Sequence, residues 1–187
     1  MAITQLDPKT ALIVIDLQKG ILAFPTAHPT DKIVKLARQM IDAFRRHHLP
    51  IVFVNVDGVA PGRTEAPRPR LDQFPADWAD LVPELNRQPS DHLVTKQTWG
   101  AFTNTGLDEH LQKLGITQLV ILGVATSAGV ESTARYAHEN GYHITFAVDA
   151  MTDMNADAHT NSVTRIFPKI GETGTTQEIT ALLDKRT

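Results

Sequence analysis

Short apolar runs alternate with longer amphipathic stretches along the chain. The runs are rich in Val and Ile and do not alternate with polar residues, which is typical of parallel strands that are covered on both faces. Five of them are therefore predicted to form buried strands: residues 11–15, 51–56, 92–95, 118–123 and 143–148.

The stretches between these runs have helical periodicity. Residues 31–48 show it most clearly, because one helical stripe carries Ile33, Ala37, Met40, Ile41 and Phe44. Further helices are predicted over residues 107–114, 130–140, 156–166 and 176–185, with Gly115 and Gly141 as the residues that end two of them.

Strands and helices in strict alternation indicate an α/β fold with a mainly parallel central sheet. We expect residues 1–187 to form a single domain, because this length suits one core. Residues 58–75 are irregular and contain four prolines and several arginines. We interpret them as a long surface loop of the kind that often covers a binding site.

Composition removes several classes of function. The formal net charge is -3 and the basic residues are scattered, which argues against nucleic acid or a membrane surface as partner. There is no cysteine, which excludes disulfides, thiolate catalysis and cysteine metal sites. The early apolar run at 11–15 is too short for a signal sequence or a membrane span. We therefore expect a soluble cytoplasmic protein.

Charged residues follow four of the predicted strands, at Asp16, Asp57, Lys96 and Asp149. Ligands bind open parallel sheets beyond the carboxyl ends of their strands, so these side chains are candidates for a shared site. Each also has a purely structural interpretation. An aspartate after a strand is often a turn or capping residue, which we favour for Asp149, and a single lysine there is usually solvated.

Four segments together resemble the isochorismatase-like hydrolases: "TALIVIDLQKG", "VTKQTWGAF", "GVATSAGVESTAR" and "AVDAMTD". This resemblance implies three layers, with a parallel sheet of six strands between two layers of helices. Most members use Asp, Lys and Cys as catalytic residues, which correspond here to Asp16, Lys96 and Gly129. The glycine departs from that majority. The histidines of the nicotinamidase metal site are also missing after Asp57, and we expect neither a metal nor a cofactor.

One branch of this family, the isochorismatases proper, also resembles the chain in having glycine at that position, and it hydrolyses a vinyl ether. Such a reaction needs no nucleophilic side chain, because protonation of the enol-ether carbon gives an oxocarbenium ion to which water adds. The resemblance thus implies Asp16 as the general acid and Lys96 as the group that holds its geometry and the substrate's charge. The expected partner is a small anionic substrate, isochorismate being one candidate.

The resemblance also implies a non-proline cis peptide in the loop after residue 123, whose backbone N–H groups and helix N-terminus would bind an anion. Trp99 and Phe102 are expected as pocket walls, although either could belong to the core or to a subunit contact. An arginine of the long loop could pair with a substrate carboxylate. The expected substrate-binding residues are Ala125, Thr126, Ser127, Trp99, Phe102 and Asp57, with Arg63, Arg68 and Arg70 as the loop arginines.

Other functions remain open at this point. The chain could be a catalytically silent homologue that binds a small acid or serves as an assembly subunit, or an amidase that uses direct attack by water. Serine catalysis by Ser127 or Ser132 needs a neighbouring histidine, and the sequence places none at the carboxyl ends of the three motif strands. We expect a homo-oligomer, because family members often associate and the helices have apolar faces.

Overall fold

A computed structural model describes residues 3–67 and 71–185. It contains one sheet of six strands, all paired in parallel. The expected fold class is therefore confirmed. The strands are β1 (Thr10–Ile15), β2 (Ile51–Val56), β3 (His92–Lys96), β4 (Gln118–Val124), β5 (His143–Thr152) and β6 (Glu172–Gly174).

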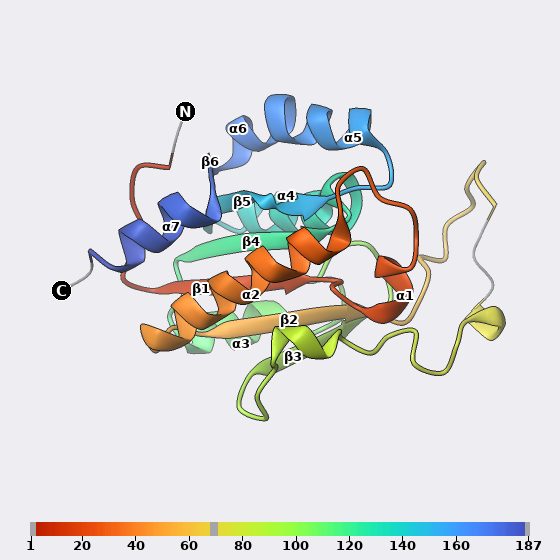
Figure 1. Ribbon diagram of the computed structural model, residues 1–187, viewed down its shortest axis with the longest axis horizontal. Helices are drawn as coiled ribbons and strands as arrows, with labels where there is room; N and C mark the ends of the chain where they lie inside the picture. Colours follow the sequence, from red (N-terminus) through yellow and green to blue (C-terminus); the bar gives the residue numbers. More distant parts are fainter. Residues whose placement is uncertain (1–2, 68–70, 186–187) are drawn as a thin grey trace.

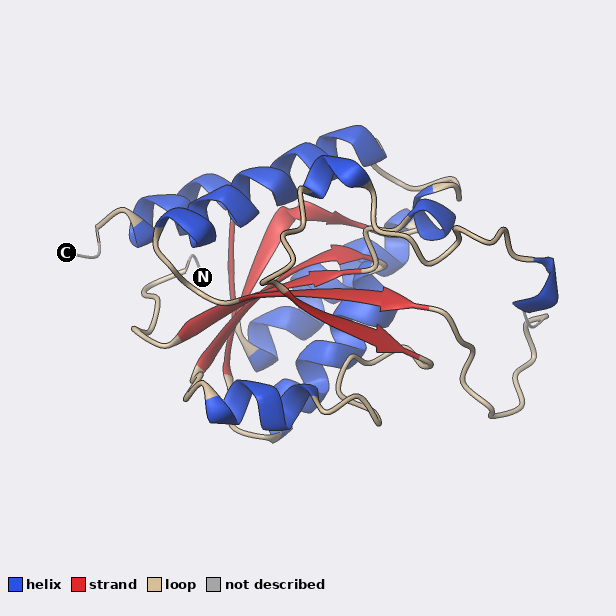
Figure 2. Ribbon diagram, turned by 90° about the horizontal axis from the view of Figure 1, so that it is seen from below, coloured by secondary structure: helices blue, strands red, loops and turns tan. Residues whose placement is uncertain are grey.

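Helices cover both faces of the sheet (Figures 1 and 2). One layer contains α2 and α7, which contact each other and β5. The opposite layer contains α3, α4, α5 and α6. The helix bounds are α1 (Lys19–Leu22), α2 (Thr30–Arg46), α3 (Leu107–Lys113), α4 (Glu131–Glu139), α5 (Ala156–Asn161), α6 (Phe167–Ile170) and α7 (Thr176–Leu183).

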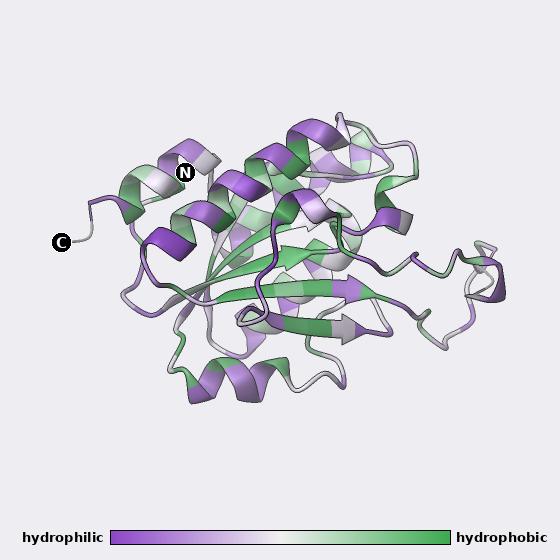
Figure 3. Cartoon of the chain, turned by 60° about the horizontal axis from the view of Figure 1, so that its bottom comes forward, coloured by the Kyte–Doolittle hydropathy of each residue, from purple (hydrophilic) through white to green (hydrophobic). Residues whose placement is uncertain are grey.

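The central strand β1 explains why both layers form. Its side chains point alternately to the two faces, so Leu12 and Val14 pack with α2 while Ile13 and Ile15 pack in the opposite core. The whole strand is buried, and most strands are apolar over most of their length whereas the helices are apolar on one side (Figure 3). The unbroken apolar runs of the sequence follow from this double coverage.

Most predicted helices are confirmed within a few residues at each end. Gly115 and Gly141 follow α3 and α4 with φ of 67° and 86°, a conformation that glycine adopts without strain. The helix expected over 156–166 is divided instead. After α5 the backbone widens into a π-helical turn, η4 (Ser162–Ile166), and α6 then begins at Phe167 with a proline in its first turn.

The strand order β3-β2-β1-β4-β5-β6 reverses direction between β1 and β4. The loops that leave these two strands therefore run in opposite directions and open a crevice at their carboxyl ends, which is where ligands bind in such sheets. The long loop that leaves β2 projects beyond the same end of the sheet (Figure 2). Within the part of the chain that is described, no helix is both long and apolar enough to cross a membrane.

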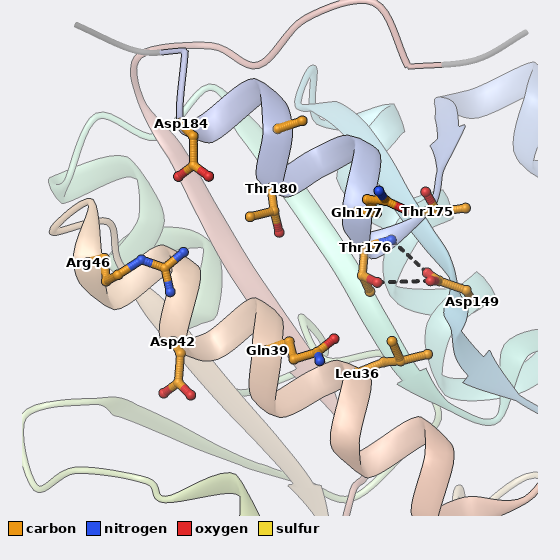
Figure 4. A pocket seen from close by; sticks show the side chains of 11 residues that line it. Leu36, Gln39, Asp42, Arg46, Asp149, Thr175, Thr176, Gln177, Thr180 and Asp184 are labelled. Carbon is orange, nitrogen blue, oxygen red and sulfur yellow. Dashed lines mark hydrogen bonds between the residues drawn. The ribbon is translucent and has the colours of Figure 1, made fainter.

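One strand end was predicted wrongly. β5 does not stop before Asp149 but continues to Thr152. The Asp149 carboxylate accepts hydrogen bonds from Thr176 N (2.7 Å) and Thr176 Oγ1 (2.8 Å) at the start of α7 (Figure 4). Its role is to satisfy the first turn of that helix, so the structural interpretation of Asp149 holds.

Candidate active site

Asp16 and Lys96 form a buried ion pair at the carboxyl ends of β1 and β3. Lys96 Nζ donates to Asp16 Oδ2 at 2.8 Å and to the carbonyl oxygen of Thr98 at 3.1 Å. The two side chains are only 6% and 2% exposed. A charged pair is this deeply buried only where its geometry is well satisfied, because taking each charge out of water is costly.

The Asp16 carboxyl is poised to hold a proton. Its burial raises the pKa from 3.8 to about 6, against the opposing effect of the Lys96 charge and hydrogen bond. Its second oxygen, Oδ1, is buried and accepts no hydrogen bond from any residue that the structure describes. The Asp16 backbone has a φ of 49°, which turns the chain sharply out of β1 and into the crevice. A buried carboxyl with a free oxygen and a pKa near 6 suits a general acid.

Gly129 lies directly beside this carboxyl. It belongs to a π-helical turn, η3 (Thr126–Val130), which connects β4 to α4. The Val124–Ala125 peptide that begins the connection is cis, as the resemblance implied. A Cβ added to Gly129 would lie 3.1 Å from Asp16 Oδ2 and 3.1 Å from Ile15 Cγ2. The glycine therefore lies in close contact with the acid, and a side chain at this position would crowd the carboxyl.

A cavity of about 290 Å³ opens onto the Asp16–Lys96 pair. This is at the small end of the range for ligand sites, about 300–1,000 Å³. Asp16 and Lys96 are the only charged side chains among its described lining residues. The others are Ile21, Phe24, Val56, Gly58, Val59, Ala60, Phe74, Trp78, Thr98, Trp99, Val124, Ala125, Ala128, Gly129 and Met154.

Five of the predicted site residues are brought together at this cavity: Asp16, Lys96, Trp99, Ala125 and Gly129. The long loop contributes as well, through Gly58, Val59, Ala60 and Phe74. Trp99 is 64% exposed and stands at the mouth. Motif residues from β1, β3 and β4 thus converge, as expected from their shared position at strand ends.

Four predicted substrate-binding residues do not line the cavity. Phe102 is buried in the core, where its ring stacks on Tyr136 at 4.7 Å, so the core alternative applies. Asp57 is exposed and accepts a hydrogen bond from the Gln97 side chain. Thr126 and Ser127 turn away from the cavity and hold the loop in place. Their contribution is to the shape of the wall.

The anchors of Thr126 and Ser127 come from residues that the sequence did not indicate. Ser127 N and Oγ both donate to Asp153 Oδ2 at 2.8 Å, and Thr126 Oγ1 donates to the carbonyl of Thr152 at 3.0 Å. The same hydroxyl is 2.8 Å from His159 Nδ1. Thr126 is completely buried, so this hydroxyl–imidazole pair does not reach the cavity as a nucleophile. Asp153 directly follows the last residue of β5, so it would have been a candidate only if the end of that strand had been predicted correctly.

The remaining candidates are less informative. Arg63 is exposed and is not part of the cavity lining, and Arg68 and Arg70 lie outside the described residues. Across residues 3–67 and 71–185, no group of three His, Asp or Glu side chains is arranged to hold a metal ion.

A larger groove of about 770 Å³ lies between α2 and α7 and shares no residue with the cavity at Asp16 (Figure 4). Polar side chains such as Gln39, Asp42, Arg46 and Asp184 line it. In this groove the Asp149 carboxylate already accepts two hydrogen bonds from Thr176. The described residues that line the groove include no buried pair of titratable groups. The buried pair of titratable groups lies instead in the cavity at the β1/β4 switch point.

The chain is similar to known proteins over most of its length. Residues 10–178 match the isochorismatase domain. The chain is 43% identical to the uncharacterized isochorismatase family protein YwoC of Bacillus subtilis (strain 168), over 91% of this chain and 92% of that protein. It is 31% identical to the ureidoacrylate amidohydrolase RutB of Stutzerimonas stutzeri (strain A1501), over 80% and 71%.

The same similarity appears in three dimensions. The structure of an isochorismatase family protein from Burkholderia thailandensis superposes with a TM-score of 0.92 at 39% identity, covering 98% of this chain and all of that one. The chain therefore belongs to the isochorismatase family, whose characterised relatives include hydrolases.

Proposed function

We propose that this protein is a hydrolase that cleaves a small anionic vinyl ether by acid catalysis, with Asp16 as the acid. The observation that carries the proposal is the state of Asp16. Its carboxyl is buried, has a pKa raised to about 6 and keeps one oxygen without a hydrogen-bond partner among the described residues. It lies at the end of a cavity that Gly129 also lines.

The reaction uses these groups in sequence. The Asp16 proton passes to the terminal carbon of the enol ether, and positive charge develops on the carbon that bears the ether oxygen. Water adds to that carbon and returns a proton to the Asp16 carboxylate. The resulting hemiketal then breaks its bond to the leaving oxygen and gives a ketone and an alcohol. No covalent bond to the protein forms, which is consistent with glycine at position 129.

Lys96 has two tasks in this proposal. An ammonium group has three N–H donors, and two of them are engaged with Asp16 and Thr98. The third would hold the substrate carboxylate. That contact offsets the effect of Lys96 on Asp16, because an anion beside the lysine weakens its stabilisation of the Asp16 carboxylate and so favours the protonated acid.

A water-attack amidase is the second candidate, supported by the amidohydrolase relative. It is the weaker one, because amides leave poorly without covalent catalysis and no nucleophile stands at Gly129. A silent binding homologue would keep the cavity without turnover.

The test is pyruvate release from enol-pyruvyl ethers, isochorismate among them, by the purified protein and by Asp16→Asn. We expect release that the substitution abolishes. Release that survives it would exclude Asp16 as the acid. Binding without release of any product would favour the silent homologue.

A further inference from the structure

The cavity has an aromatic wall, and only one of its rings, Trp99, belongs to the segments that carry the family resemblance. Four rings line it, from Phe24, Phe74, Trp78 and Trp99. Trp78 is at the centre of this arrangement. The Phe74 ring stacks on it at 3.8 Å with an interplanar angle of 8°, and the Phe24 ring meets its edge at 5.8 Å and 75°. Such packing fixes the orientation of the indole.

The residues that follow Asp16 also hold Trp78 in place. Gly20 N donates to the carbonyl of Trp78 at 3.0 Å, and Gln18 Nε2 donates to the same oxygen at 3.1 Å. A Cβ on Gly20 would come within 2.1 Å of the Trp78 ring, so only glycine lets the indole lie against the backbone there. Gln18 is fully buried and also bonds both backbone groups of Val56. Trp78 is therefore fixed relative to Asp16.

The charge of the cavity is also defined. Among its described lining residues Asp16 and Lys96 carry the only charges, and they oppose each other. When Asp16 holds the proton that catalysis needs, the net charge of the lining is that of Lys96 alone. One substrate carboxylate balances it. Among the described lining residues a second carboxylate would find no cation and would face apolar and aromatic side chains, which is strongly unfavourable.

We propose that the substrate is a monoanion whose leaving group is a flat apolar ring that packs within this aromatic wall, and that Trp78, which orders the wall, sets this specificity. The inference rests on the proposed function for its chemistry, and it deepens it by naming the substrate class. A dicarboxylate such as isochorismate is then a poor substrate. The expected reaction converts an aryl enol-pyruvyl ether and water into pyruvate and a phenol.

The experiment compares three ethers that all release pyruvate: 2-phenoxyacrylate, its dianionic counterpart 2-(3-carboxyphenoxy)acrylate, and 2-methoxyacrylate, which has no ring. We expect kcat/KM for 2-phenoxyacrylate to exceed that of the dianion by about tenfold or more, which corresponds to about 1.4 kcal/mol. Equal or faster turnover of the dianion would overturn the inference.

Variants at Trp78 test the wall itself. Trp78→Ala should raise KM for 2-phenoxyacrylate by about tenfold with a smaller effect on kcat, and Trp78→Phe should restore most of the loss. The same substitution should change the values for 2-methoxyacrylate much less. The control is Leu114→Ala, which removes a partly exposed apolar side chain after α3 and leaves the cavity untouched. An unchanged KM in Trp78→Ala would overturn the role of Trp78.

Unreactive analogues separate this inference from the proposed function. Phenoxyacetate and 3-carboxyphenoxyacetate are titrated into the wild-type protein by calorimetry. If phenoxyacetate binds more tightly than 3-carboxyphenoxyacetate and no ether is turned over, the acid-catalysed reaction is rejected. The preference of the cavity for a monoanion with an aromatic ring is then still supported. Absence of binding by both analogues would reject the substrate class even if another ether were hydrolysed.

Discussion

Gly129 and Asp16 are so close that a Cβ on the glycine would stand 3.1 Å from the Asp16 Oδ2 atom. That oxygen is the one that accepts the Lys96 hydrogen bond. The glycine therefore lies against the bonded edge of the ion pair, and any side chain at this position must displace a neighbour or be displaced.

Gly129→Ala should consequently impair activity more than stability. The backbone at Gly129 is not in the left-handed region. Alanine should therefore stabilise the folded protein by about 0.4–1 kcal/mol, because it lowers the conformational entropy of the unfolded chain, and this offsets part of the cost of crowding. A small shift of Asp16 should lower kcat by about tenfold or more. Kinetics and urea unfolding together measure this.

Gly100→Ala is the matched control for that substitution. Its Cβ would meet Ser132 O at 3.6 Å, an ordinary contact. The explanation fails if both alanines lower kcat equally.

The pH dependence of the rate follows from Asp16. The acid must be protonated, and burial raises its pKa to about 6. We expect kcat/KM to be highest below this pH and to fall as pH rises through it. Asp16→Asn should remove about 100-fold or more of the rate at the optimum. A rate that increases from pH 5 to pH 8 would contradict the role of Asp16 as acid.

The same group should leave a signature in stability. Because its folded pKa lies above the unfolded value of 3.8, Asp16 binds its proton more tightly in the folded protein, and stability declines as pH rises from about 4 to about 6. The decline attributable to Asp16 is at most about 3 kcal/mol, from about 1.4 kcal/mol for each pKa unit.

Urea unfolding of wild type and Asp16→Asn across this pH range measures the effect as a difference. The wild-type protein should lose stability relative to the variant as pH increases. A difference that stays constant from pH 4 to pH 7 would show that the folded state does not perturb this carboxyl.

Asp153 is expected to stabilise the turn that holds Gly129. It is 4% exposed and accepts hydrogen bonds from Ser127 N, Ser127 Oγ and Asn155 N. Asp153→Ala leaves these partly buried donors without their charged acceptor and should lower the free energy of unfolding by about 2 kcal/mol, with a fall in kcat. Asp157→Ala, on the exposed surface of α5, is the control and should change neither quantity.

Substitution of Asp149 should affect stability but not activity, unlike substitution of Asp153, although both aspartates belong to the same part of the chain, at the end of β5. Asp149→Ala removes the acceptor for Thr176 N and Oγ1 and should destabilise the protein by about 1–2 kcal/mol. Because it bonds α7 and not the cavity, kcat should remain at the wild-type value. Loss of activity in the folded variant would instead connect the α2–α7 groove to function.

Part of the fold could be predicted because its signal is local. Fully apolar runs identify strands covered on both faces, and the glycines after α3 and α4 mark helix ends through their own backbone preference. The short strand β6 and the π-helical turns have no such signal. β6 forms because β5 supplies its hydrogen bonds, and a sixth strand was expected only from the family resemblance.

The sequence by itself determined where the acid, the lysine and the glycine stand, because Asp16 follows β1, Lys96 ends β3 and Gly129 lies in the turn after β4. Parallel strands bring those ends to one edge. The tertiary structure alone decided what surrounds them. Phe102 went into the core and Trp78 into the cavity, and Asp153 bonded to Ser127, because these outcomes depend on how distant loops fold back over the sheet. Periodicity carries no information on such contacts, which only packing resolves.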